Sequence, residues 1–200
     1  MKKTIYSLIC ALGCIAGIWS LAACDDDTWG NDNEEMMNVF YFGFENWGQL
    51  KNDVTYTVKQ GQIVNIPMQF WCAGERSFDA IALYYVDSSL TLGTDFQIVD
   101  ENGNSLQPDS NGAFTMQWNL QSPDATNNHR IQNIRVKALQ GKTGKVTVTT
   151  FNPRDVDGAG KVKISNGSSD GIIYTPNYAT GEYEVHCLTQ NYKAVVTIEK

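Results

Sequence analysis

The sequence predicts an all-β fold, an antiparallel β-sandwich, and three observations lead to this prediction. Apolar and polar residues alternate with period two in many short runs after Asn38. Turns rich in Gly, Asn and Asp separate these runs, at intervals of about 8–15 residues. We find no run with the spacing of an amphipathic helix. Together these patterns predict about ten or eleven short strands around one core.

Each expected strand follows from its own pattern. Pro67 lies within the third of them and predicts an edge strand or a bulge, because proline has no N–H to donate to a ladder. Ala80 to Val86 is apolar on both faces and predicts a central strand. Asp100 to Asn104 predicts a tight turn. The strands are expected at 39–44, 54–58, 64–72, 80–86, 96–99, 114–118, 134–138, 146–151, 162–164, 183–187 and 194–198.

The N-terminal segment has the plan of a secretory signal peptide. Lys2 and Lys3 precede an apolar stretch from Ile5 to Ala23. A single transmembrane helix is the alternative, but the flank that follows the stretch is acidic. Leu21-Ala22-Ala23-Cys24 resembles the lipobox of bacterial lipoproteins. This resemblance implies that residues 1–23 are cleaved off and that Cys24 carries a lipid anchor to the outer membrane.

An acidic tether is expected after the anchor, and the folded domain after the tether. Residues 24–37 contain the lipidated cysteine, six acidic residues and no basic residue, so they are expected to be extended. The run resembles the surface-export signal of Bacteroidota lipoproteins; a simple spacer on a periplasm-facing anchor is the alternative. Cleavage removes two lysines and no acid, so the formal net charge changes from −7 to −9. This charge argues against nucleic acid as a partner. Residues 38–200 are expected to form one β-sandwich domain.

The segment from Val54 to Phe151 resembles a Calx-beta or immunoglobulin-like sandwich. Leu92-Gly93-Thr94-Asp95-Phe96 stands where that family has Gly-x-Asp-Tyr/Phe. The acidic, calcium-binding part of the family pattern is not evident, so calcium binding does not carry over. Together with the lipobox, the chain is similar to small Bacteroidota lipoproteins of unknown function that occur alongside glycan-uptake systems.

Candidate catalytic and metal-binding residues are few. His186 and Cys187 are adjacent on one strand, so they point to opposite faces and cannot act together. Asp155 and Asp157 match half of a calcium loop, although a Gly-rich turn between strands is the favoured interpretation. The sequence contains no nucleophile elbow and no phosphate-binding loop. We therefore expect neither enzyme activity, nor a metal, nor a cofactor.

The remaining candidates are aromatic residues and two cysteines. Trp118 shares a face with Phe114 and Met116 and is expected in the core. Trp71 lies on the face opposite Phe70, and Trp47 lies in a loop, so both are expected to be exposed and are the candidate ligand-binding residues. The alternative for Trp71 is that the C-terminal segment covers this face and makes the residue part of the core.

Cys72 and Cys187 are expected either to form a disulfide or to remain two buried thiols. These observations predict a non-catalytic surface or outer-membrane lipoprotein that binds glycan or assists an uptake complex. A structural or adhesive surface protein is the alternative.

Overall fold

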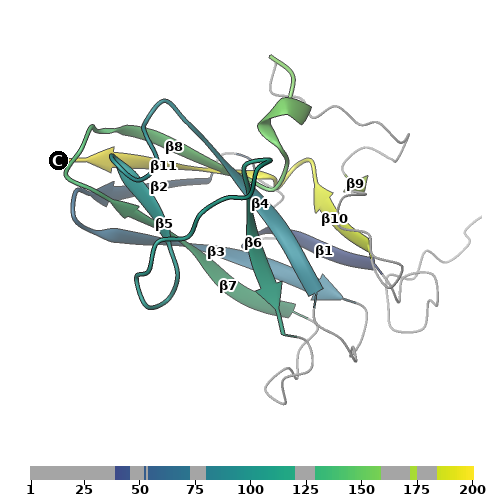
Figure 1. Cartoon of the computed structure of the whole chain (residues 1–200). Helices are drawn as coiled ribbons and strands as arrows, with labels where there is room; N and C mark the ends of the chain where they lie inside the picture. The colour runs from purple at the N-terminus through teal and green to yellow at the C-terminus, as the bar shows by residue number, and fades with distance from the viewer. Residues whose placement is uncertain are drawn as a thin grey trace, which may run out of the picture.

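The computed structural model describes residues 39–45, 52, 54–72, 80–119, 129–158, 172–174 and 184–200 (Figure 1). The signal peptide, Cys24 and the acidic tether lie outside these residues, as does the strand expected at 162–164. The strands are β1 (Val39–Phe44), β2 (Val54–Lys59), β3 (Ile63–Cys72), β4 (Ala80–Ser88), β5 (Phe96–Val99), β6 (Ala113–Trp118), β7 (His129–Ala138), β8 (Gly144–Thr149), β9 (Ile172–Tyr174), β10 (Glu184–Leu188) and β11 (Lys193–Glu199). A short 3-10 helix, η3 (Pro153–Asp155), follows β8.

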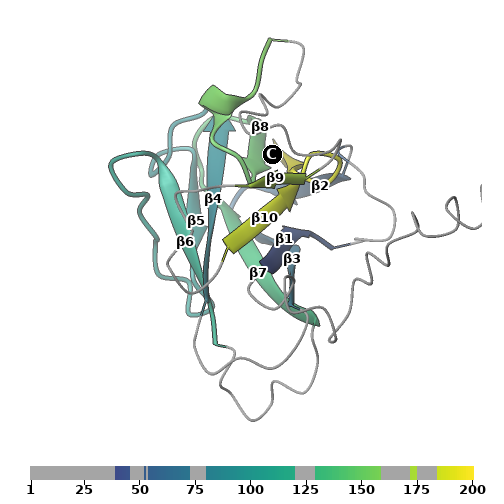
Figure 2. The ribbon, with the colours of Figure 1, turned by 90° about the vertical axis from the view of Figure 1, so that its right-hand side faces the viewer.

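The strands form two sheets, which confirms the predicted all-β class. The six-stranded sheet has the order β5-β7-β3-β1-β10-β9, and the five-stranded sheet has the order β2-β11-β8-β4-β6. Figure 2 shows β4 and β6 on one side and β1, β3 and β7 on the other. The prediction that all pairs are antiparallel was wrong. β1 pairs with β10, and β11 pairs with β2, in parallel. In both cases the tertiary fold joins strands that no hairpin connects.

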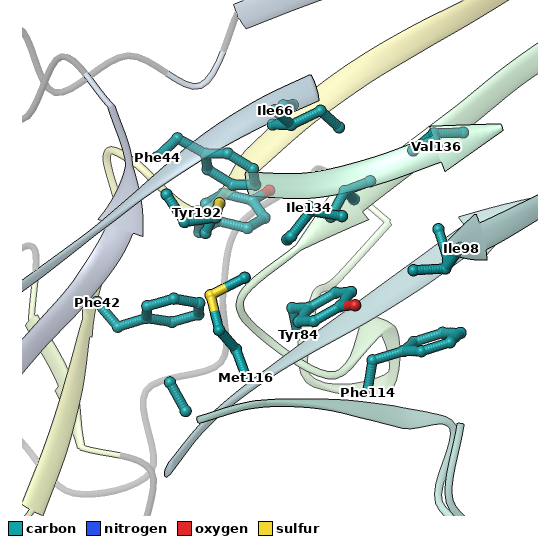
Figure 3. Close-up of a cluster of buried hydrophobic side chains, with 14 of the residues drawn as sticks. Phe42, Phe44, Ile66, Tyr84, Ile98, Phe114, Met116, Ile134, Val136 and Tyr192 are labelled. Carbon is teal, nitrogen blue, oxygen red and sulfur yellow. The ribbon is translucent and has the colours of Figure 1, made fainter. Parts of the chain in front are cut away.

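The inner faces of the two sheets enclose one hydrophobic core. Trp118 of β6 is fully buried, as predicted, and its ring stacks on Phe70 of β3 at 4.9 Å between centroids. The ring of Phe42 on β1 meets Trp118 edge-on at 6.2 Å. Figure 3 shows Met116 reaching toward Phe42 from the opposite layer. These contacts join the sheets face to face, as in a sandwich.

Pro67 lies within an interior strand, which corrects the prediction of an edge strand. β3 lies between β7 and β1. The carbonyl of Pro67 accepts a hydrogen bond from the N–H of Glu45, just beyond the end of β1. In an antiparallel ladder the N–H and C=O of one residue point to the same side. The missing N–H of Pro67 therefore faces the end of β1, and the ladder with β7 loses no hydrogen bond.

Asp95 joins two connections that cross between the sheets. One connection leads from β4 to β5, and the other leads from β7 to β8. The Asp95 carboxylate accepts hydrogen bonds from the N–H of Thr91 at 2.8 Å and of Lys142 at 2.7 Å. A Cβ at Gly141 would overlap this carboxylate, so only glycine fits there. The aspartate of the Gly-x-Asp-Phe motif thus has a structural role in this chain.

The predicted turn after β5 and the predicted central strand are both confirmed. Asp100 accepts from the N–H of Asn102 and of Asn104, and also from the Asn104 side chain. β4 has a neighbour on each side, β8 and β6. Among the described residues, no helix is long and apolar enough to cross a membrane.

Candidate ligand-binding face

A row of aromatic side chains crosses the outer face of the six-stranded sheet. Trp71 of β3 is paired with Tyr41 of β1, and Tyr41 is paired with His186 of β10. The ring of Tyr41 lies 5.7 Å from the rings of both neighbours. His129 of β7 and Tyr174 of β9 occupy the register positions at the two ends of this row. We call Trp71, Tyr41 and His186 the aromatic row.

The centre of the aromatic row is firmly packed. Only 3% of the Tyr41 side chain is exposed, and Val39 and Leu188 are buried in the same cluster. Burial raises the pKa of the Tyr41 phenol to about 12, because the charged form would lose its hydration. Tyr41 is therefore neutral at physiological pH and acts as a rigid support for the two rings beside it.

Trp71 lies on the face that the sequence predicts, but it is less exposed than expected. Ile66, Met68 and Phe70 are fully buried on the inner face of β3, so the alternation is confirmed. Trp71 itself is half-buried, because its ring packs against Tyr41 and the cluster around it. Part of the indole remains open to solvent. This makes Trp71 a supported platform and not a freely projecting side chain.

Two amide side chains lie on the same face of β3 as Trp71. Gln69 is half-buried beside Trp71, and Asn65 is exposed further along. The Oε1 atom of Gln69 is buried and accepts no hydrogen bond from the described residues. An unpaired buried acceptor costs about 1–3 kcal/mol, so such a group calls for an explanation.

Of the two alternatives for Cys72 and Cys187, the disulfide is ruled out, because Cys187 is a free, buried thiol. Cys72 pairs with Phe40 and Cys187 pairs with Phe42, on opposite sides of β1. Two strand spacings and a two-residue offset separate the Cα atoms by roughly 12 Å. A disulfide requires less than about 7 Å. Burial raises the pKa of the Cys187 thiol to about 12.

His186 and Cys187 point to opposite faces, as predicted. Cys187 lies in the core, whereas His186 lies in the aromatic row. Trp47, the second candidate platform, lies outside the described residues, and so does the lipidation candidate Cys24.

A pocket of about 420 Å³ lies beside η3 and contains one of the two calcium candidates. Asp157 lines it together with Asp87, Lys193 and three other polar or aromatic residues, Thr147, Thr149 and Tyr192. Asp155, at the end of η3, is exposed. Among the described residues, no three His, Cys, Asp or Glu side chains gather as a metal site would require. The rest of the candidate calcium loop lies outside those residues.

A second cleft, of about 360 Å³, was not predicted from the sequence. It lies between the edge of β6 and the middle of β7 and is lined by the amides of Gln117, Gln132 and Asn133 and by Arg135. These residues come from strands in different sheets, so no local pattern brings them together. Tyr41 was also missed, although its position opposite Phe40 and Phe42 on an alternating strand is a signal for the outer face.

Comparisons with known proteins give no family. No protein-family model and no curated protein matches the chain. A chain of the CaDoc0917–CaCohA2 complex is 12% identical, with a TM-score of 0.35, over 80% of this chain and 99% of that one.

The Pseudomonas fluorescens alkylpurine DNA glycosylase AlkC is 8% identical, with a TM-score of 0.24, over 80% of this chain and 30% of that one. AvmM, described as catalysing macrocyclization in alchivemycin A biosynthesis, is 10% identical, with a TM-score of 0.27, over 72% of this chain and 84% of that one. Likenesses this low carry no functional argument.

Proposed function

We propose that the protein is a non-catalytic lipoprotein, anchored to the outer membrane through Cys24 and facing the cell surface, that binds glycan. The glycan-uptake systems named above for similar lipoproteins are its proposed setting. One observation carries the binding proposal: half-buried Trp71 is held by Tyr41 at 5.7 Å, with Gln69 next to it on the same face. The apolar face of a sugar stacks on such a ring, while amides bond its hydroxyls.

The aromatic row suits a binding platform better than a catalytic centre. Its central ring is neutral and buried, and Cys187, the thiol next to His186, points into the core. A rigid ring loses little conformational entropy when a ligand stacks on it, which favours binding.

A glycan array probed with the full-length protein in mild detergent tests the proposal. We expect retention of at least one class of glycan and its loss in Trp71→Ala. Because Trp71 is half-buried, this substitution also lowers the free energy of unfolding by about 1–2 kcal/mol. Trp71→Phe keeps an aromatic platform and is expected to retain most of the binding.

Ile81→Ala is the matched control. Ile81 is 43% exposed on the five-stranded sheet, so its removal takes away apolar surface far from the aromatic row. Binding should be unchanged in this variant. Wild-type binding by folded Trp71→Ala would refute the platform.

The anchor is tested separately. We expect Cys24→Ala to leave an unprocessed or soluble chain that no longer fractionates with the outer membrane, whereas Cys187→Ala, which changes a core thiol, should fractionate like the wild type. An unchanged mass and fractionation of Cys24→Ala would contradict the anchor. Protease accessibility on intact cells distinguishes the surface from the periplasmic face.

A further inference from the structure

The cleft of about 360 Å³, lined by Gln117, Gln132 and Asn133, lies where the edges of the two sheets come together. β5 pairs with β7 only from Arg135 to Ala138, and its last residue, Val99, then bridges to Ser105. β6 is the last strand of the other sheet. The side chain of Gln132 spans the gap and donates a hydrogen bond from Nε2 to the carbonyl of Gln117 at 2.8 Å. This hydrogen bond links the two strands that flank the cleft.

The polar lining of the cleft is weakly acidic, with two carboxylates, Asp100 and Glu101, and one base, Arg135. The Asp100 carboxylate accepts three hydrogen bonds within its own turn, at 2.8–2.9 Å. The hydrogen bond from the Asn104 side chain is the main cause of the lowered pKa of Asp100, so this carboxylate stays charged but has its hydrogen bonds within its own turn. Glu101 and Arg135 are the other charged residues of the lining. This balance does not favour phosphate or carboxylate ligands.

Amides dominate what is left of the lining. Asn102, Gln117 and Asn133 each offer a donor and an acceptor, and Met116 and Leu106 supply apolar surface beside them. Vicinal hydroxyl groups on an apolar ring present the matching chemistry. The cleft thus suits a neutral sugar.

The cleft is continuous with the face that carries Trp71. Asn133 and Arg135 lie in register with Pro67 and Asn65 of β3, the strand of Trp71. Four residues along the strands and one step across them separate Trp71 from Asn133 by about 14 Å. Between them lies Ile131, which is 55% exposed and pairs with Gln69. We call this surface, from Trp71 past Ile131 to Asn133, the track. A single sugar ring cannot contact both of its ends.

We propose that the cleft is a second sugar subsite, and that the ligand is an unbranched oligosaccharide running from Trp71 along β3 and β7 into the cleft. This inference rests on the proposed function, because it assigns the length and direction of the same ligand. Short forms of the ligand occupy the Trp71 end, and only longer forms reach Asn133 and Gln117.

The test is a titration of the full-length protein with a length series of the glycan that the array identifies. We expect the double variant Gln117→Ala/Asn133→Ala to bind the shortest members like the wild type. It should bind the longest about tenfold more weakly, as expected when several hydrogen bonds are lost. Trp71→Ala should weaken every length.

Two further variants keep the test decisive. Gln140→Ala removes an exposed amide from the turn after β7 and should bind every length like the wild type. If the double variant unfolds, Asn133→Asp takes its place, since it retains the shape and replaces the amide donor.

The outcomes separate the two proposals. Equal binding of all lengths by the wild type and the double variant, with loss in Trp71→Ala, overturns the second subsite and leaves the proposed function standing. Retention of no glycan, or wild-type binding by Trp71→Ala, overturns the proposed function and the shared track with it. An affinity of the wild type that does not rise with length also overturns the track.

Discussion

β1 and β11 have the same kinds of neighbour in the two sheets, but they differ on their outer faces. Each is an interior strand with one parallel and one antiparallel neighbour. Each points a fully buried row into the shared core. On the outer face, however, β1 carries Tyr41, which is buried, whereas β11 carries Lys193, Val195 and Thr197, which are half-buried.

The difference shows which part of each strand the fold requires. The inner rows satisfy the core in the same way, so the sandwich does not demand an aromatic residue at Tyr41. The outer face of β11 has β-branched or charged residues at the corresponding positions, although β11 also has one parallel and one antiparallel neighbour. The aromatic row is therefore an addition to the fold, which is why we place function there and not on the five-stranded sheet.

The largest expected effect comes from the inner rows. Phe42→Ala should lower the free energy of unfolding by about 3–5 kcal/mol, because it removes a buried ring that contacts Trp118. Val196→Ala, at an inner position of β11, removes less volume and should cost about 2 kcal/mol. Urea unfolding measures both. Losses below about 1 kcal/mol in either variant would show that the sheets are not jointly packed.

The second effect is a difference in stability cost between the outer faces of β1 and β11. Tyr41→Ala should cost about 2–4 kcal/mol, since only 3% of this side chain is open to solvent. Val195→Ala should cost about 1 kcal/mol or less, because the valine is half-buried. Tyr41→Phe keeps the ring as a control. Equal costs for the two alanine variants would remove the contrast between β1 and β11.

The third effect concerns the link between the sheets. Hydrogen bonds from the backbone N–H groups of Lys142 and Thr91 lower the pKa of Asp95 in the folded chain. The stability that Asp95 contributes is thus present above its unfolded pKa, about 3.9, and disappears as the pH falls through the lower, folded value. Asp95→Asn should lower the melting temperature at pH 7.

The pH dependence of this difference is the diagnostic part. Melting temperatures of the wild type and Asp95→Asn should converge as the pH falls below about 4. Asp87→Asn, at an exposed acid of β4, is the control and should match the wild type throughout. A constant gap between Asp95→Asn and the wild type from about pH 7 to about pH 3 would show that the carboxylate charge is irrelevant.

The smallest effect tests two exposed isoleucines. Ile131 on β7 and Ile81 on β4 are 55% and 43% exposed, one on each sheet. Ile131→Thr and Ile81→Thr should each change the free energy of unfolding by less than about 0.5 kcal/mol. If the oligosaccharide crosses β7, only Ile131→Thr should weaken binding of the long glycans. Equal binding by both variants would argue against that path.

Period-two alternation predicted most strand positions and the facing of Trp71, Trp118 and Cys187. It works because successive side chains of a strand point to opposite faces whatever the strand pairs with. β1 was placed at its observed bounds for this reason. The burial of Tyr41 was not predicted, because it depends on Trp71 and His186, which adjacent strands bring to its sides.

The order of the strands could not be read from the sequence. Val39 pairs with Glu184 and Val54 pairs with Ala194, and no local signal connects positions so far apart. The cleft depends on this order, since it needs the edge of β6 beside β7. The choice between a disulfide and two thiols stayed open for the same reason: both cysteines were placed on apolar faces, and only the strand order shows that β1 lies between their strands.

The parallel pairing of β1 with β10 and of β2 with β11 sets the time at which this chain can fold. β1 and β2 wait for partners that lie far downstream, since Val39 pairs with Glu184 and Val54 pairs with Ala194. At about 5–20 residues per second, this wait is on the order of ten seconds. Until then the paired edges of β1 and β2 are open to other chains. The interval during which these edges are exposed is therefore set by the sequence distance between the paired strands.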